Sequence, residues 1–294
     1  MNGIFLLDKP IGISSNAALQ KVKRLFRAKK AGHTGSLDPL ATGMLPICFG
    51  DATKFCQYLL DSDKTYLVTM QLGVRTATSD AEGAIISTRF VPNFSFEDID
   101  TAFHHFRGNI QQIPSMFSAL KHNGKPLYEY ARAGITIERP SRAITIYDLT
   151  VISLDNNHVT FSVHCSKGTY VRTIVDDVGE HLQCGAHVTA LRRLSVGPYQ
   201  EKQMMTIEKL ESLMSDNTFS VNHILLPMDS AVTHWPAVTV SLPHTNALKK
   251  GQSVLLPDAP SEGWMRFVDP TGEFFGVGIV AENGRIVPKR LVAL

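Results

Sequence analysis

The residue best suited to chemistry in this sequence is an isolated acid, Asp38, within the segment GHTGSLDPLATGMLPICFG at 32–50. Between Lys30 and Asp51 it is the only Asp, Glu, Lys or Arg. A carboxylate among small, apolar and turn-forming residues costs free energy unless a partner or a substrate compensates its charge. Asp38 is therefore a candidate nucleophile or general base, and the residues alone leave both roles open.

Two other groups of reactive side chains suggest different chemistry and have simpler explanations. Asp38 and Asp51 could form the carboxylate pair of a glycosidase, but Asp51 stands where it would cap a helix. His181, Cys184 and His187 follow a spacing that could hold zinc. Since no second cluster in the sequence clearly supplies the remaining ligands, we expect no metal.

Basic residues gather in two segments of the chain. Residues 1–54 hold eight Lys and Arg against three acids, and residues 107–142 hold six against two, although the net charge is only +2. If both segments fold onto one face, they would form a footprint for a polyanion such as nucleic acid. On charge alone, an ordinary solvated surface fits the pattern equally well.

The composition is typical of a cytoplasmic globular protein. Of the 294 residues, 44% are hydrophobic, which suffices for a large buried core. The four cysteines form no C-x-x-C pair, which is typical of reduced thiols. We expect a cytoplasmic location without membrane association, because no apolar stretch could span a bilayer and the first residues lack the basic start of a signal peptide.

The order of the predicted elements favours an α+β fold with a mixed, largely antiparallel sheet. Alternating apolar residues predict a strand over 64–73, and Ser95 with Asp98 resembles a capping box that opens a helix through Phe106. Residues 107–125 show no clear period and are expected to form a long functional loop. The other predicted elements are a strand ending at Pro10, helices over 16–30, 51–60 and 167–182, and strands over 142–153, 158–165 and 188–197.

The composition also divides the chain into two predicted domains. From about residue 231 the chain consists of short strands and turns, which suggests a small β-barrel-like domain at 231–294. The larger α+β domain would then span residues 1–230, with 107–125 as an insertion.

Six blocks of the sequence, in order within residues 3–197, closely resemble the bacterial tRNA pseudouridine-55 synthase family, the TruB family. The blocks are GHTGSLDPLATGMLPICFGDATKF, KTYLVTMQLG, TATSDAEG, SALKHNGKPLYEYARAG, CSKGTYVRTI and LRRLSVG. The resemblance implies a pseudouridine-synthase catalytic domain, and the tail resembles the PUA-type RNA-binding domain that follows it in the family. It also implies isomerisation of uridine 55 in the T-loop of tRNA, without cofactor or metal, because no redox change occurs and no atom is lost.

The same resemblance implies roles for individual residues. Asp38 matches the catalytic aspartate that acts on a flipped-out nucleotide, and Arg172 matches its partner, which would keep the carboxylate ionised. Tyr66 matches a tyrosine that stacks on the target base with its hydroxyl near C5. The other implied substrate contacts are Tyr170, Leu191 beneath the base, His33 against the refolded T-loop, and Lys121 and Lys125 toward phosphates from the insertion.

Two alternative functions make different predictions. A pure RNA-binding module would need neither Asp38 nor the tyrosine pair, and a hydrolase acting on nucleosides or glycosides would release free uracil or sugar. The resemblance implies the T-arm stem-loop of tRNA as the partner and no small-molecule cofactor. We further expect a monomer.

Overall fold

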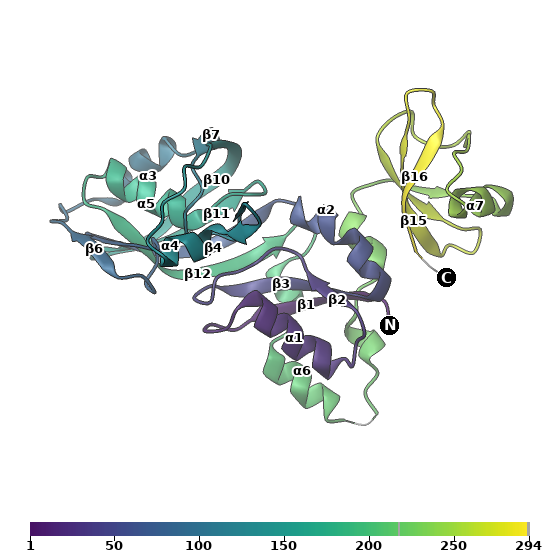
Figure 1. Cartoon of the computed structure of the whole chain (residues 1–294), viewed down its shortest axis with the longest axis horizontal. Helices are drawn as coiled ribbons and strands as arrows, with labels where there is room; N and C mark the ends of the chain where they lie inside the picture. Colours follow the sequence, from purple (N-terminus) through teal and green to yellow (C-terminus); the bar gives the residue numbers. More distant parts are fainter. Residues whose placement is uncertain (217, 293–294) are drawn as a thin grey trace.

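The computed structural model describes residues 1–216 and 218–292, and its largest element is a sheet of eight strands (Figure 1). The strand order is β1-β3-β12-β4-β11-β10-β7, with β2 paired to β3. Among the described strands of this sheet, only β3 and β12 pair in parallel, so the predicted α+β class with a largely antiparallel sheet is confirmed. The strands are β1 (Gly3–Lys9), β2 (Ala31–His33), β3 (Thr42–Phe49), β4 (Lys64–Leu72), β7 (Gly108–Gln112), β10 (Arg142–Asp155), β11 (His158–Cys165) and β12 (Ala186–Val196).

Helices cover this sheet in two groups, with α3 and α5 over one part and α1 and α6 over the strands at the other end (Figure 1). Two short hairpins project from the body, formed by β5 with β6 and by β8 with β9. Among the described residues, no helix is both long and apolar enough to cross a membrane. The bounds are α1 (Ser15–Leu25), η1 (Gly50–Phe55), α2 (Cys56–Leu60), β5 (Val74–Thr76), β6 (Ile85–Thr88), α3 (Phe96–His104), β8 (Lys121–His122), β9 (Lys125–Pro126), α4 (Leu127–Arg132), α5 (Val171–His181), η2 (Glu201–Gln203), α6 (Ile207–Met214), η3 (Val221–Ile224) and η4 (Met228–Val232).

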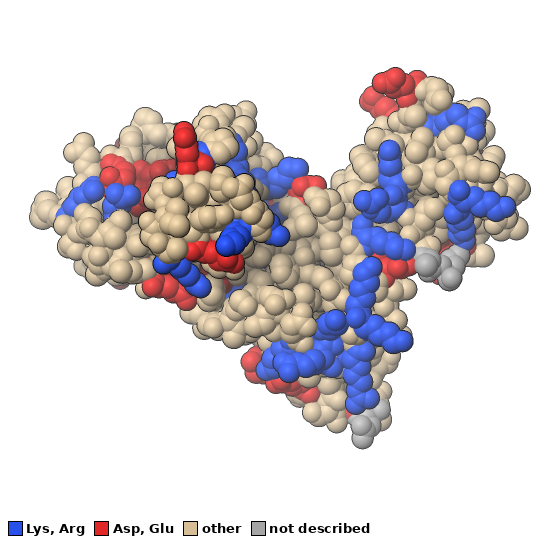
Figure 2. Space-filling view, in the orientation of Figure 1, with Lys and Arg blue, Asp and Glu red and all other residues tan. Residues whose placement is uncertain are grey.

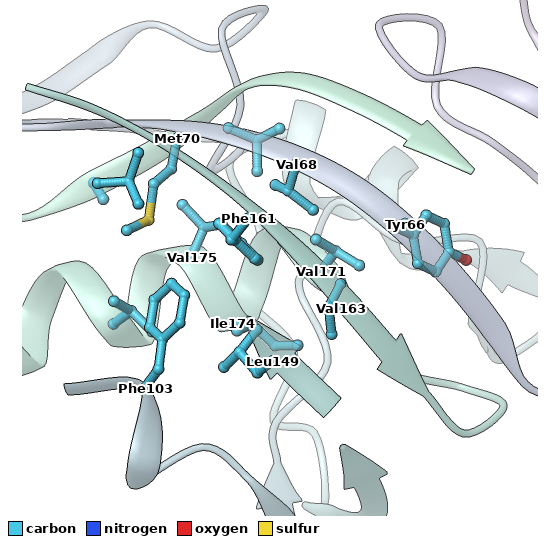
Figure 3. Packing of buried hydrophobic residues seen from close by; sticks show 14 of the residues in the cluster. Tyr66, Val68, Met70, Phe103, Leu149, Phe161, Val163, Val171, Ile174 and Val175 are labelled. Carbon is cyan, nitrogen blue, oxygen red and sulfur yellow. The ribbon is translucent and has the colours of Figure 1, made fainter. Parts of the chain in front are cut away.

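The core beneath α3 and α5 also positions one predicted site residue (Figure 3). Along β4 every second side chain is buried, as expected for a strand with one face on the core. Val68 and Met70 therefore pack against the helices, and Tyr66 lies on the same face at the edge of the cluster. Its hydroxyl points away from the packed side chains (Figure 3).

The last part of the chain forms a separate four-stranded sheet of order β13-β14-β15-β16. Helix α7 lies beside it (Figure 1), and its own apolar cluster includes Phe267 and Phe275. The bounds are β13 (Ala237–Thr239), α7 (Leu242–Lys249), β14 (Trp264–Val268), β15 (Phe274–Val280) and β16 (Ile286–Leu291).

Aromatic side chains join this sheet to the large one. The ring centroids of Phe55 and Phe274 lie 5.4 Å apart. Trp235 stacks on Trp264 at 4.8 Å, and Tyr58 meets Trp235 edge-on at 4.8 Å. Buried residues of β1, β3, η1 and β15 belong to one apolar cluster. The two sheets therefore share a hydrophobic core, in which η1 and α2 are the connecting layer.

The structure confirms the predicted helix start at Ser95. The helix predicted over 16–30 is also present, but it ends earlier than predicted. The capping box at Ser95 is present, with the Ser95 Oγ accepting from Asp98 N at 3.2 Å. The helix predicted over 16–30 is α1, which stops at Leu25. It stops there because Arg27 adopts a left-handed conformation with φ +48° that cannot continue the helix.

Two local predictions are wrong, and one strand was not predicted. Residues 108–112, expected in a loop, form the edge strand β7, which pairs with β10. Asp51 does not cap a helix, because the capping position belongs to Phe49 and Asp51 pairs with Lys54 at 3.1 Å. Strand β3 was not predicted, because its side chains are nearly all buried and show no alternation.

Candidate active site

One cavity of about 400 Å³ collects five of the predicted site residues, which are Asp38, Tyr66, Tyr170, Arg172 and Leu191. A volume of this size suits a small ligand such as a single base with its sugar. Tyr66 comes from β4, Leu191 from β12, and Tyr170 and Arg172 from the start of α5. Asp38 comes from the loop between β2 and β3. Residues distant in the sequence thus converge on one hollow.

Asp38 and Arg172 form a two-pronged ion pair. The Arg172 Nε lies 2.9 Å from the Asp38 Oδ2, and its Nη2 donates to the Asp38 Oδ1 at 3.3 Å. The Arg172 side chain is only 7% exposed, whereas the Asp38 carboxylate is 40% exposed, toward the hollows that it lines. Arg172 therefore compensates the charge of the Asp38 carboxylate, while part of the carboxylate remains exposed to the hollows.

Arg172 is itself fixed by contacts on every side. Its Nη1 donates to the carbonyl oxygen of Thr78 at 2.9 Å, and its Nη2 donates to that of Phe117 at 2.8 Å. The buried carboxylate of Asp80 lies 3.4 Å from Nη1. Such a saturated guanidinium cannot turn away from Asp38 without breaking several hydrogen bonds.

Asp80 is a site residue that sequence reasoning did not single out. It is almost fully buried, and its Oδ1 accepts from the Thr78 Oγ1 at 2.5 Å and from Glu82 N at 3.1 Å. The carboxylates of Asp80 and Asp38 therefore both pair with the guanidinium of Arg172. The only sequence signal was its place in the block TATSDAEG.

The loop that carries Asp38 is held by buried polar side chains. The Ser15 Oγ accepts from Leu37 N at 2.7 Å, and the buried Lys9 Nζ donates to Pro39 O at 3.4 Å. Arg193 Nη2 donates to Gly35 O at 3.1 Å. These contacts from three elements fix the loop on both sides of the acid, so Asp38 is preorganised.

One glycine is required where this loop enters β3. Gly43 has φ +95°, and a Cβ there would lie 2.3 Å from the carbonyl oxygen of Arg193. Any side chain would push β3 away from β12 in the only parallel pair of the large sheet. The close approach of these strands keeps the Asp38 loop near Leu191.

The surroundings shift the pKa values of the site. Burial raises the pKa of the Asp38 carboxyl; Arg172 opposes this, Asp80 reinforces it, and Lys9 opposes it. Burial lowers the pKa of Lys9 to about 8. Burial also raises the pKa of Tyr66, so its hydroxyl stays protonated at neutral pH. The site combines a carboxylate that is easier to protonate than usual with a neutral phenol.

The cavity brings Tyr66 and Leu191 together on one wall. In the register of β4 with β12, Tyr66 lies opposite Arg193, and Leu191 lies opposite Val68. Both side chains are largely buried, with their remaining exposure at the cavity. Both therefore contribute apolar side-chain surface to the cavity.

Tyr170 also lines the cavity, and its main chain is held by a buried glutamine, Gln112. The Gln112 Nε2 donates to Tyr170 O at 3.1 Å, and its Oε1 accepts from Tyr170 N at 2.8 Å. Because the side-chain amide satisfies both main-chain groups, it acts like a neighbouring strand. Sequence reasoning missed Gln112 because it lies in the segment expected to be a loop.

Replacing this glutamine should loosen the segment before α5. Gln112→Leu leaves the N–H of Tyr170 unpaired and removes one of the hydrogen bonds that its C=O accepts, which should lower the free energy of unfolding by about 1–3 kcal/mol. Chemical denaturation measures this, with Gln111→Leu as a matched control, since Gln111 is the exposed neighbour on the same strand. Equal losses in both variants would contradict this role of Gln112.

Three other predicted residues do not line the cavity. His33, on β2, has a partly buried ring whose Nδ1 has no hydrogen-bond partner among the described residues. Burial lowers its pKa, and Arg193 adds to this. Lys121 and Lys125 are exposed on the β8–β9 hairpin. The residues just before them, Ser118, Ala119 and Leu120, do border the cavity.

The histidines and cysteine of the H-x-x-C-x-x-H spacing have separate partners. His187 makes a hydrogen bond with Val74 O through Nδ1, at 2.8 Å. The His181 ring lies 4.5 Å from that of His105. In the part of the chain that the structure describes, no three His, Cys, Asp or Glu side chains gather as a metal site.

Three segments of the amino-acid sequence match models of named protein families. Residues 23–171 match the "TruB family pseudouridylate synthase (N terminal domain)". Residues 172–233 match the "tRNA pseudouridylate synthase B C-terminal domain", and residues 236–292 match "Pseudouridine synthase II TruB, C-terminal".

Whole proteins agree with these matches. A "tRNA pseudouridine synthase B" of Yersinia pestis (strain Pestoides F) is 57% identical over 302 residues, covering 99% of this chain and 92% of the relative. A protein of the same name from Coxiella burnetii (strain RSA 493 / Nine Mile phase I) is 51% identical over 293 residues, covering 99% and 95%. A chain in the solved "Cbf5-Nop10-Gar1 Complex" has the same fold, with a TM-score of 0.77 at 24% identity over 98% of this chain and 83% of that one.

The family models and the named relatives define the class of protein as a pseudouridine synthase, an isomerase. The chain belongs to the TruB family of these enzymes.

Proposed function

We propose that this enzyme isomerises uridine to pseudouridine at position 55 in the T-loop of tRNA. The support is twofold: its relatives are named tRNA pseudouridine synthase B, and its cavity, which Tyr66 and Tyr170 also line, holds the carboxylate of Asp38 paired with Arg172. That ion-paired, preorganised and open carboxylate is the observation that carries the proposal.

The reaction needs no added atom. The C1′–N1 bond breaks, the uracil turns within the cavity, and a bond forms from C5 to C1′. C5 loses its proton to solvent and N1, which has lost its bond to the sugar, gains one, so uridine and pseudouridine have the same composition. Asp38 starts this as a nucleophile or as a base on a sugar proton, Tyr66 and Leu191 hold the uracil, and Arg172 keeps Asp38 ionised.

The nucleotide must leave its base stack to reach Asp38, at a cost of a few kcal/mol. We propose that Tyr170 contacts the everted nucleotide and that His33, outside the cavity, supports the refolded T-loop. The His33 Nδ1 is buried and has no hydrogen-bond partner among the described residues, so such a contact would be made by the exposed part of the ring. A nucleotide that fills the cavity would displace water from the sugar, which favours re-formation of a bond to carbon over hydrolysis.

The surface charge supports an RNA partner, and we propose that a single chain binds tRNA in the cytoplasm. Figure 2 shows Lys and Arg gathered over the end of α1 and continuing toward the C-terminal sheet. We propose that residues 231–294 are a PUA-like RNA-binding domain beside a catalytic domain of 1–230. We also propose that the insertion at 107–125 contacts phosphates. The exposed cations involved are Arg24, Arg27, Lys29, Lys30, Lys121, Lys125, Lys289 and Arg290.

A T-arm stem-loop with tritium at C5 of the target uridine tests the function. We expect tritium release to solvent, equal pseudouridine formation, and no free uracil. Release of uracil or sugar would instead show a hydrolase. Binding without tritium release would show an RNA-binding module, and the proposal would fail.

The pH dependence of this reaction should reflect the site. Because the pKa of Asp38 is raised and the ionised form is needed, activity should fall with acid at a pH above the ordinary value for Asp of about 4. Single-turnover rates between pH 4 and 8 measure the acidic limb. A rate that stays constant from pH 8 down to pH 4 would contradict the raised pKa.

A further inference from the structure

A second hollow of about 510 Å³ opens beside the active-site cavity. The two share Leu60, Ser166 and Gly168, so they are continuous at the mouth. The second hollow lies between the start of β10 and the turn that precedes α5. A nucleotide chain with one base in the first cavity would run past or into the second.

One arginine, Arg142, is fixed between the two hollows. Its guanidinium carbon lies 5.3 Å from the ring centroid of Tyr170, in a cation–π contact. The turn leaves room for it, because a Cβ on Gly168 would lie 3.3 Å from the Arg142 Nη1. The stacking holds the guanidinium without using its hydrogen-bond donors.

The charges in this hollow leave Arg142 available to an anion. The other cation, Lys167, pairs with Asp61 at 2.9 Å in an exposed contact. Among the described residues, no carboxylate forms an ion pair with Arg142. The hollow therefore presents one stacked, uncompensated guanidinium and one cation whose partner is solvent-exposed.

We propose that this hollow is a phosphate subsite, in which Arg142 binds the RNA phosphate adjacent to the everted uridine. A guanidinium matches phosphate geometry through paired N–H donors. Lys167 adds a second positive charge at the same place. The subsite rests on the proposed function, since it binds the backbone of the same RNA whose base fills the first cavity.

The subsite gives Arg142 two functions, which a test must separate. Arg142 could merely hold the Tyr170 ring, or it could also hold the phosphate. Stem-loops that carry one neutral methylphosphonate in place of a single phosphate separate these roles. Single-turnover kmax/K½ is measured for each stem-loop with the wild type and with Arg142→Gln.

With the wild type, we expect one methylphosphonate beside the target uridine to lower kmax/K½ by about tenfold. Arg142→Gln should lower kmax/K½ on the unmodified RNA by a similar factor. In that variant the same methylphosphonate should cost less than about twofold more, because the two changes remove one interaction. Arg142→Lys should keep part of the sensitivity, since it retains the charge without the planar stacking.

The control is Lys209→Gln, which removes an exposed cation on α6, away from both hollows. It should leave the methylphosphonate profile unchanged. The subsite is overturned if Arg142→Gln lowers the rate but remains as sensitive as the wild type at every phosphate. Failure of the proposed function looks different, because the wild type would then form no pseudouridine on the unmodified stem-loop.

Discussion

Asp38→Asn should lower the single-turnover rate of pseudouridine formation by about 10⁴-fold or more. The substitution preserves shape but removes the charge needed to attack or to accept a proton. Affinity for the stem-loop should change less than about tenfold, because the proposed phosphate contacts lie elsewhere. Tritium release and filter binding measure the two effects separately.

Asp51→Asn is the matched control for this substitution. Asp51 pairs with Lys54 in η1 and is not among the residues that line the cavity. Its rate should stay within about twofold of the wild type. A loss of activity in both variants would point instead to paired carboxylates, as in a glycosidase, and a binding loss above about 100-fold for Asp38→Asn would point to misfolding.

Arg172→Ala should damage both stability and catalysis. Removing this buried cation leaves the buried Asp80 and the partly buried Asp38 facing each other without compensation. Breaking a buried pair in this way costs about 3–5 kcal/mol of unfolding free energy. The rate should fall by about 10²-fold or more, since Asp38 would be protonated more easily and held less well.

Denaturant unfolding and single-turnover assays measure these losses. Arg89→Ala is the control, because Arg89 makes an exposed pair with Glu180 at 2.9 Å, worth at most about 1 kcal/mol. Arg172→Lys keeps the charge but loses the two-pronged contact, and it should be intermediate. Wild-type stability together with wild-type rate in Arg172→Ala would contradict the role of this ion pair.

The sequence predicted elements whose signal is local. The strand at β4 alternates in burial, and the helix at α3 begins with a capping box. Strand β7 was not predicted because its residues are mostly polar and exposed, and only its pairing with β10 makes it a strand. Strand β3 was not predicted because an interior strand buried on both faces has no alternation, and it also contains Pro46.

Some residues of the site could be predicted from the sequence, and others could not. Asp38 is visible as an isolated charge, and the resemblance to a family supplied Arg172, Tyr66, Tyr170 and Leu191. Asp80 and Gln112 were missed, because each acts through a contact that only the fold creates. Such supporting residues carry no periodicity and no charge pattern of their own.

The aromatic contacts between the two sheets hold the C-terminal sheet at a fixed distance from the cavity. Trp235, Trp264 and Phe274 belong to the same packed layer as Phe55 and Tyr58, so the distance from the last sheet to the cavity is set by interlocked rings. An RNA that touches both ends must match that span. Deleting the C-terminal sheet would lay bare the apolar side chains of η1 and α2, so surface substitutions are the cleaner probe of its contacts.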